Sequence, residues 1–433
     1  MFRWLKRFKV TIVVVIALIG FFIWWNGTRG YDDQALAGLP DLSGVDESSV
    51  LEDGGSKLEA SYQDYYEELV KQDVKDAEGF SLTLNGADYT AISSTGAKKL
   101  DQLGDRQGSV VALEEEESWV EYTFDVPADG FYQMSMDYYA MEGKRSSIVR
   151  SVQVDGSYPF YQSKKLEFQR MWQEAGKTWT DNQGNEFNPR REEVFGWQNR
   201  AFKDSEGKSY DPFRYYLTKG KHTIRIGNIR EPGAIGAVYI FAPEHLPTYA
   251  DVQKQYAEQG YKPVSNILIK VQAEAATLRS DPTLKRIEDR EPDTEPFNRD
   301  AIALNSFGGA SWRTGGQWAQ WEVEVPESGL YEIGARYGQW YLNGIPVQRA
   351  ITIDGKFPFK EMNEMTFPYK SEWQISKFGA KDDSDPYLFY LEKGKHTIRM
   401  EVQVGALGPL LETVTNTVRK MSLIGREVIQ VTG

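Results

Sequence analysis

The sequence DPFRYYLTKGKHTIRI at residues 211–226 returns as DPYLFYLEKGKHTIRM at residues 385–400, with eleven of sixteen positions identical. A second stretch, residues 119–160, aligns without a gap onto residues 318–359. The two copies are offset by 199 residues in the stretch that begins at Trp119 and by 174 residues in the stretch that begins at Asp211. The first copy therefore holds 25 more residues than the second between these two stretches. A repeat this long exceeds any solenoid unit and predicts two domains, each with a hydrophobic core of its own.

Inside both copies the apolar residues recur with a period of two, which is typical of half-buried strands. In WVEYTFDVP, at residues 119–127, apolar side chains alternate with polar ones, and WAQWEVEVP at residues 318–326 repeats the pattern. An Asp-Gly pair follows in each copy, at 155–156 and 354–355, and predicts a tight hairpin. The fold is therefore predicted to be all-β, with two tandem antiparallel β-sandwiches or jelly rolls, and SLIGREVIQV at residues 422–431 is expected to be the last strand.

The N-terminus predicts the compartment. Four basic residues within residues 3–9 precede a mostly apolar, uncharged run over residues 10–25, which as a helix spans roughly 24 Å. Positive charge before the run and two aspartates after it predict a single-pass anchor in the cell membrane, with both domains extracellular. An Ala-x-Ala match at residues 35–37 lies about ten residues beyond the run, so an uncleaved anchor is favoured over a removed signal peptide, which remains the alternative.

The domain organisation follows from these patterns and from two amphipathic stretches. Leu58, Tyr62, Tyr65 and Leu69 recur at helical spacing, and TYADVQKQYAEQG at residues 248–260 lies between a proline and a glycine, as a linker helix would. The predicted order is a transmembrane signal anchor at 1–27, a flexible stalk at 28–55, an amphipathic helix at 56–75, a first β-sandwich at 76–245, a helical linker at 246–262 and a second β-sandwich at 263–433.

Composition and motifs exclude several functions. Fifty Lys and Arg against 63 Asp and Glu give a net charge of −13, so nucleic acid is not an expected partner. No cysteine is present, which excludes disulfides and thiolate chemistry. His222 and His396 occupy matching positions in the repeated KGKHTIR turn, which favours a structural role over general-base catalysis. The chain is not expected to be an enzyme, and a glycoside hydrolase is the less favoured alternative.

The repeated residues carry a resemblance. The order Trp-x-x-[Tyr/Trp]-x-x-x-Val-Pro-x-x-Gly-x-Tyr, then Asp-Gly, then Leu-x-x-Gly-x-His-Thr-Ile resembles the galactose-binding-like jelly rolls that serve as carbohydrate-binding modules in secreted bacterial proteins. The anchor, stalk and two modules also resemble the N-terminal half of large sugar-transporter substrate-binding proteins of Gram-positive bacteria. The resemblance implies a glycan ligand, a sugar-transporter permease as partner, and a structural calcium ion held by Glu274, with Asp88 as the nearest substitute in the first copy.

Sugar recognition needs an aromatic face under the ring and polar groups at its rim, and loops outside the shared stretches are where such residues collect. The candidates in the first copy lie in or near its additional residues, and those in the second copy lie in a glycine-rich stretch and a later loop: Trp172, Trp179, Trp197, Asn199, Trp312, Arg313, Trp340, Tyr341 and Asn343. Each tryptophan equally suits packing of a long loop onto a sandwich. A structural or protein-interaction scaffold of a transporter or envelope complex is accordingly the alternative function.

Overall fold

The computed structural model describes residues 59–432, apart from residues 210, 342 and 380–383. The predicted membrane anchor and stalk lie outside the described residues. Within the described part, no helix is both long and apolar enough to cross a membrane. Residues Glu59–Ile429 cluster as one unit. We call residues 76–245 the first module and the residues from 263 onward the second module.

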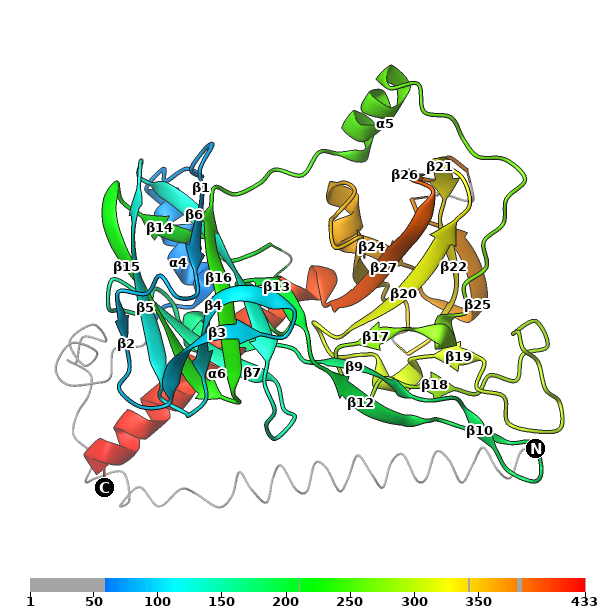
Figure 1. The fold of residues 1–433 in the computed structure, drawn as a ribbon, viewed down its shortest axis with the longest axis horizontal. Helices are drawn as coiled ribbons and strands as arrows, with labels where there is room; N and C mark the ends of the chain where they lie inside the picture. The colour runs from blue at the N-terminus through cyan, green and yellow to red at the C-terminus, as the bar shows by residue number, and fades with distance from the viewer. Residues whose placement is uncertain (1–58, 210, 342, 380–383, 433) are drawn as a thin grey trace, which may run out of the picture. The chain divides into compact units, whose positions relative to one another are not determined.

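The first module places its core between two antiparallel sheets (Figure 1). Its strands are β1 (Ser81–Asn85), β2 (Ala91–Ile92), β3 (Ala97–Leu103), β4 (Arg106–Leu113), β5 (Trp119–Val126), β6 (Gly130–Ala140), β7 (Ile148–Val154), β8 (Leu166–Phe168), β13 (Trp197–Ala201), β14 (Tyr215–Leu217), β15 (Gly220–Arg230) and β16 (Gly233–Phe241). One sheet has the order β13-β6-β16-β4-β3, with β1 on β16 and β14 on β6, and the other has the order β2-β5-β15-β7-β8. Tyr122 of β5 and Met136 of β6 belong to one buried cluster, so both sheets close on the same core.

The second module repeats the arrangement with smaller outer sheets. Its strands are β17 (Leu278–Arg279), β18 (Arg286–Ile287), β19 (Ser306–Phe307), β20 (Trp318–Val325), β21 (Gly329–Glu332), β22 (Gly334–Gln339), β23 (Val347–Ile353), β24 (Met365–Phe367), β25 (Lys370–Lys377), β26 (Leu388–Leu391) and β27 (Gly394–Gln403). The main sheet contains β17-β20-β27-β23-β24, and the pairs β21–β26, β22–β25 and β18–β19 form separate ladders. Ile351 of β23 and Phe389 of β26 share a buried cluster, which makes this module two-layered as well.

A long hairpin built from the first module's additional residues joins the two modules. It consists of β9 (Met171–Ala175), β10 (Trp179–Thr180), β11 (Glu186–Phe187) and β12 (Arg190–Val194), and we call it the arm, residues 171–194. Strand β9 pairs with β17 at Trp172 and Arg279, so the second module's sheet runs β12-β9-β17-β20-β27-β23-β24 (Figure 1). The additional residues of the first copy therefore form strands of the second module's sheet.

Two helices cover the module cores where the sequence predicts helices. Helix α4 (Tyr62–Lys71) begins at Ser61, whose hydroxyl accepts from the Asp64 amide, and its tyrosines pack on the first core. Helix α5 (Tyr249–Glu258) begins with a capping box between Thr248 and Asp251. Tyr249 of α5 is buried in the second core, so each helix closes the module that follows it in the chain.

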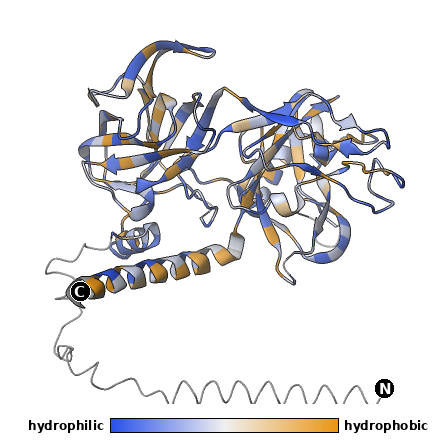
Figure 2. Cartoon of the chain, turned by 90° about the horizontal axis from the view of Figure 1, so that it is seen from below, coloured by the Kyte–Doolittle hydropathy of each residue, from blue (hydrophilic) through white to orange (hydrophobic). Residues whose placement is uncertain are grey.

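The C-terminal segment is a helix, and the predicted strand over residues 422–431 is wrong. Helix α6 (Gly408–Thr432) includes the whole of that stretch. Read with the residues before it, the segment places Leu411, Val414, Val418 and Met421 at alternating spacings of three and four, which is the helical period and not the period of two. Figure 2 shows hydrophobic residues along the length of this helix.

The repeated Asp-Gly pair and the repeated histidine form the same hydrogen-bonded turn in both modules. Asp155 and Gly156 have φ of 50° and 77°, and their counterparts in the second module have 51° and 77°, as a type I′ turn requires. His222 lies with Nδ1 2.6 Å from Asp155 Oδ2 and Nε2 2.6 Å from the Thr218 carbonyl. His396 makes the matching contacts, so both ring nitrogens face acceptors and a doubly protonated ring suits both sites.

These contacts predict that stability falls as pH rises. Burial alone would lower the pKa of His222 and of His396, but the carbonyl and aspartate oxygens beside each ring raise it on balance. A folded-state pKa above the unfolded value of about 6.5 gives stability that is complete below that pH and is lost as pH rises through the folded pKa. Urea midpoints measured from about pH 6 to about pH 9 are expected to decline, and the double variant His222→Gln, His396→Gln to flatten the decline.

The third histidine supplies the matched control for this experiment. The His245 side chain is 81% exposed and lies outside both repeated turns, so His245→Gln controls for the loss of a histidine as such. A slope that persists in the double variant would show that other groups cause it.

Candidate functional site

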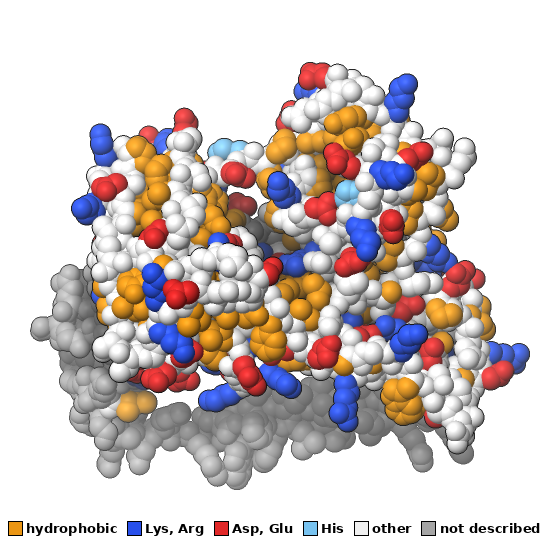
Figure 3. All heavy atoms as spheres, in the orientation of Figure 1, with side chains coloured by type: hydrophobic (Ala, Val, Ile, Leu, Met, Phe, Trp, Pro, Cys, Tyr) orange, Lys and Arg blue, Asp and Glu red, His pale blue; other side chains and the backbone are white. Residues whose placement is uncertain are grey.

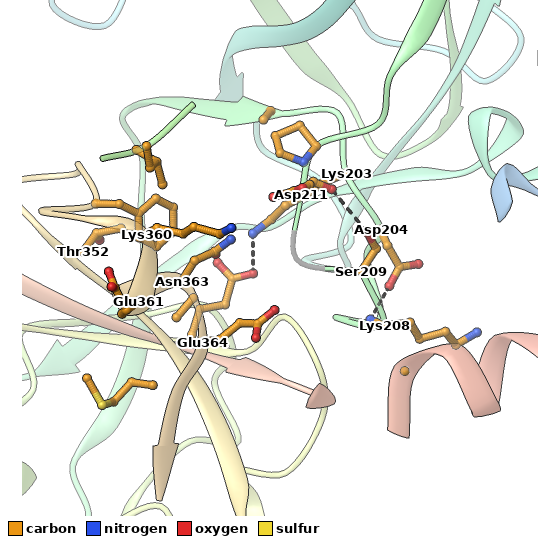
Figure 4. A pocket seen from close by; sticks show the side chains of 18 of the residues that line it. Lys203, Asp204, Lys208, Ser209, Asp211, Thr352, Lys360, Glu361, Asn363 and Glu364 are labelled. Carbon is orange, nitrogen blue, oxygen red and sulfur yellow. Dashed lines mark hydrogen bonds and ion pairs between the residues drawn. The ribbon is translucent and has the colours of Figure 1, made fainter. Parts of the chain in front are cut away.

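A cleft of about 2060 Å³ lies between the two modules (Figure 3). Sites for single small molecules usually enclose roughly 300–1,000 Å³, so this one has room for an extended ligand. One wall is β13 with residues 203–209 and 211–213 of the first module, and the other includes the 3₁₀ helix η4 (Lys360–Glu364), β24 and β27 of the second. Figure 4 shows Lys203, Asp204 and Asp211 on one side of the cleft, and Lys360 and Glu364 on the other.

Direct contacts between the modules set the width of the cleft. Lys203 Nζ lies 2.8 Å from Glu401 Oε1, and the Val404 amide donates to the Gly207 carbonyl at 2.9 Å. Gly315 packs against the same segment so closely that a Cβ there would lie 1.7 Å from the Glu206 carbonyl oxygen. Within the glycine-rich stretch 308–316, the glycine at position 315 is therefore explained by the close packing of two backbones.

A charged group of the second module forms part of the cleft lining. Arg399 donates to Gln320 Oε1 through Nη2 at 2.8 Å and Nε at 3.0 Å, and its guanidinium lies 3.8 Å from the Trp318 ring centroid. Burial lowers the pKa of Arg399. Burial would raise the pKa of Glu401, but Lys203 and Arg200 lower it on balance, so the carboxylate is charged at neutral pH.

Arg200 of β13 keeps one hydrogen-bonding group without a protein acceptor. Its Nη1 donates to Gln169 Oε1 at 3.3 Å, whereas Nη2 is buried with no partner in the described part of the chain. A buried donor left unpaired costs about 1–3 kcal/mol, so an oxygen that satisfies it gains that amount.

The remaining lining combines aromatic rings with neutral polar groups. The half-buried aromatic side chains are Tyr62, Tyr66, Trp197, Phe241, Phe357 and Tyr387, and the amide side chains are Gln63, Gln133, Gln162, Gln198, Asn199, Gln320 and Asn363. Seven Lys and Arg side chains face eight Asp and Glu side chains, so the cleft is close to neutral. Rings beside amides and paired charges suit a ligand that has both apolar faces and many hydroxyls.

Comparisons with known proteins concern the fold. No family model matches the chain, and no curated protein matches it. Among solved structures, the C-terminal CBM6 of a marine laminarinase from Zobellia galactanivorans is similar at 14% identity, with a TM-score of 0.24, over 37% of this chain and 99% of that one. A family 35 carbohydrate-binding module from Clostridium thermocellum is similar at 14% identity, with a TM-score of 0.25, over 38% and 100%.

Two of the residues that the sequence predicts for a site line the cleft. Trp197 is half-buried, donates from Nε1 to the Leu103 carbonyl at 3.1 Å, and lies beneath the Arg106 guanidinium at 4.9 Å. Asn199 is exposed and donates to Asp137 Oδ1 at 2.8 Å. Because β13 places both on one edge of the first module, Trp197 and Asn199 belong to the cleft wall.

Two other predicted residues lie on the arm. Trp172 is 5% exposed in β9, which leaves its indole no open face for a sugar. Trp179 is 54% exposed near the far end of the arm and stacks on Phe187 with ring centroids 4.2 Å apart. We therefore do not include Trp172 in the candidate site, and Trp179 lies outside the cleft lining.

The predicted residues of the second module also lie outside the cleft lining. Trp312 is half-buried and packs with a small apolar cluster, whereas Arg313 is exposed beside it. Trp340 is 39% exposed and Tyr341 60% exposed, and Asn343 is exposed in the same loop. Trp340, Tyr341 and Asn343 therefore lie in a loop that is separate from the cleft.

The predicted calcium ligand is a buried carboxylate. Glu274 lies in the 3₁₀ helix η2 (Ala273–Ala275), and burial raises its pKa. The residues that the structure describes contain no cluster of three or more His, Cys, Asp or Glu side chains that could hold a metal ion. Calcium binding by Glu274 stays a prediction.

Sequence reasoning missed Arg399 of the cleft lining because it lies inside the repeated stretch 385–400. Arg225 lies 4.0 Å from the Trp119 ring in the first module, just as Arg399 lies over Trp318 in the second, so the repeat alone indicates scaffolding. The available signal was a difference between the copies. Glu401 stands where the first copy has Gly227, and it is Glu401 that pairs with Lys203 across the modules.

Proposed function

We propose that this protein binds glycans without catalysis, and that it holds a neutral polysaccharide or oligosaccharide in the cleft between its modules. The observation that carries the proposal is a cleft of about 2060 Å³ with aromatic and amide side chains from both modules and nearly balanced charge. The repeated histidines hold turns through Asp155 and Asp354, which accounts for them without catalysis.

The ligand class follows from the charges in the cleft. Lys203 is paired with Glu401, Arg214 with Asp76, and Lys208 with Glu206. Eight Asp and Glu side chains balance seven Lys and Arg side chains in the lining, so the cleft has neither the excess of cations that a polyanionic glycan needs nor the excess of carboxylates that a polycationic one needs. Hydroxyl groups need only the neutral donors and acceptors that the amides provide, so a neutral glycan is the best fit.

Variants on the two walls test this function. Asn199→Ala on the first module and Asn363→Ala on the second each remove amide hydrogen-bonding groups that line the cleft. A lost hydrogen bond of about 0.5–1.5 kcal/mol weakens binding roughly 2- to 12-fold, and we expect each variant to show such a loss on neutral polysaccharides. Affinity electrophoresis of the full chain against a panel of neutral and acidic polysaccharides, followed by calorimetry on the best ligand, measures the effect.

Trp179→Ala and Trp340→Ala are the controls, because both side chains are exposed and lie outside the cleft lining. Neither is expected to change glycan affinity. A loss in Trp340→Ala with no loss in the cleft variants would move the site to the loop of the second module. Failure to retain any polysaccharide, with or without calcium, would contradict glycan binding itself.

The cellular setting is part of the same proposal. The basic and apolar segments within residues 3–25 support an extracellular protein anchored by one membrane span, acting beside a sugar-transporter permease. A scaffold for such a complex is the alternative function, and the exposed apolar side of α6 favours it as a protein contact. Co-purification with a permease that cleft variants do not reduce would support the scaffold.

A further inference from the structure

Helix α6 is attached to the first module through Glu412 and Arg419, and Leu423 on the same side of the helix is also buried. Glu412 accepts from Gln162 Nε2 at 2.7 Å and lies 3.6 Å from Lys208 Nζ. About two turns later along the helix, the Arg419 guanidinium lies 4.3 Å from the Tyr161 ring centroid. These contacts fix which side of the helix faces the module, and they leave the opposite side open.

The open side is apolar. Leu410, Val414, Val418, Met421 and Ile424 are between 52% and 66% exposed. Soluble helices normally bury such a side and expose the polar one, so α6 has the reverse orientation. A helix of 25 residues is about 37 Å long, and a stripe roughly 10 Å wide along it presents about 400 Å² of apolar surface. This area matches the largest apolar patch of a typical monomer, roughly 300–600 Å², and such patches often serve as contacts with another molecule.

The pattern within the stripe favours another helix as the partner. Spacings of three and four alternate along the stripe, as they do between the core positions of a coiled coil. The residues at these spacings are Leu411, Val414, Val418, Met421 and Gly425. Leu410 and Ile424 widen the stripe to about three positions in seven, as in helices that pack in bundles.

Two polar or small positions in the stripe fit close packing. The Thr417 hydroxyl donates to the Thr413 carbonyl at 2.8 Å, so its removal from water leaves no donor unpaired. Gly425 lies inside the helix, where a Cβ would meet open space, so nothing in this chain requires a glycine there. A glycine weakens a helix, and close approach of a second helix would give it a function.

A lipid surface fits the stripe less well. Helices that lie on membranes carry Trp or Phe on the apolar side, and α6 contains no aromatic residue. The flanking Thr415 and Ser422 are uncharged, so the same stripe on a second molecule meets no like charge at its edge.

We propose that α6 is a self-association surface, through which two copies of this chain pair by their apolar stripes. The two stripes together bury about 800 Å², below the ~1,200–2,000 Å² of stable complexes, so the dimer is weak and reversible. Anchoring of both copies in one membrane would favour it by raising their local concentration.

The absence of natural cysteine makes cross-linking a direct test. Val418 lies near the middle of the stripe, so in a two-fold pair it meets its counterpart whether the helices run parallel or antiparallel. The full chain carrying Val418→Cys, reconstituted in lipid vesicles at high dilution and oxidised mildly, is expected to give a disulfide-linked dimer on a denaturing gel. Lys420→Cys, exposed on the same helix but outside the stripe, is the matched control and is expected to give several-fold less.

Two further experiments distinguish a second copy of the chain from a lipid bilayer as the partner of the stripe. Adding Val414→Asp to Val418→Cys is expected to abolish the dimer, since it buries a charge in the pair. A fluorophore on Val418→Cys that is quenched by nitroxide-labelled lipids would instead place the stripe on the bilayer and overturn the proposal. Equal cross-linking of the Val418→Cys and Lys420→Cys chains, with free reaction of both thiols with a hydrophilic reagent, would also overturn it.

Discussion

Glu174→Ala is expected to lower the free energy of unfolding by about 3 kcal/mol and to release the second module from the arm. The Glu174 carboxylate accepts from Arg279 Nη2 at 3.2 Å and from Arg286 Nε at 3.0 Å. The Arg279 side chain is fully buried, and that of Arg286 is 23% exposed. Removing the carboxylate leaves the buried guanidinium of Arg279 with backbone carbonyl partners only. The half-buried side chain of Arg286, by contrast, can turn toward water.

The position of Glu174 makes this loss an effect on function as well. Glu174 lies two residues beyond Trp172, at the point where β9 pairs with β17 of the second module. We expect the variant to bind neutral glycans more weakly, because the two walls of the cleft would no longer be held at one distance. Urea unfolding measures the stability, and small-angle X-ray scattering measures the separation of the modules.

Glu192→Ala is the matched control for this variant. Glu192 lies on the neighbouring strand of the same arm and is exposed, with one hydrogen bond from Gln173. Its loss is expected to change stability by no more than about 0.5 kcal/mol. If Glu174→Ala behaves like Glu192→Ala, the buried ion pair does not hold the arm to the second module.

The arm also shows what the sequence could not predict. The strands of the repeat were predictable because their alternation is local, and the Asp-Gly turns because their conformation depends on two adjacent residues. The pairing of β9 with β17 involves residues 107 positions apart, Trp172 and Arg279, and β17 is only two residues long. No local pattern indicates this pairing. Trp172, which the pairing with the second module buries, was for that reason predicted to bind a ligand.

The cleft was predictable only in part for a related reason. Trp197 and Asn199 could be found because they lie outside the two repeated stretches. Arg399 and Gln320 lie in the repeated stretches, where a shared structural role accounts for them. The orientation of α6 was equally inaccessible, since its apolar period predicts a buried side and the contacts of Glu412 bury the other.

Arg170→Ala is expected to destabilise the protein by about 3–5 kcal/mol, the largest loss among the substitutions considered. Arg170 is 2% exposed at the base of the arm. Its Nε donates to the Ser146 carbonyl at 2.7 Å and its Nη2 to Glu231 at 2.7 Å, while Nη1 also pairs with Glu193. The side chains of Glu231 and Glu193 are 1% and 4% exposed, so the variant leaves two carboxylates buried without a cation.

A compensated variant separates this mechanism from simple loss of packing. Arg170→Met with Glu193→Leu and Glu231→Gln removes the charges together, and replacement of a whole buried ionic group is often nearly neutral, so much of the lost stability is expected to return. Arg190→Ala, an exposed arginine on the same arm, is expected to change stability by less than about 0.5 kcal/mol. If the triple variant is no more stable than Arg170→Ala, packing and not uncompensated charge explains the loss. Since Arg170 joins the arm to the first module and Glu174 joins it to the second, comparable losses at both would show that the cleft depends on both ends of one hairpin.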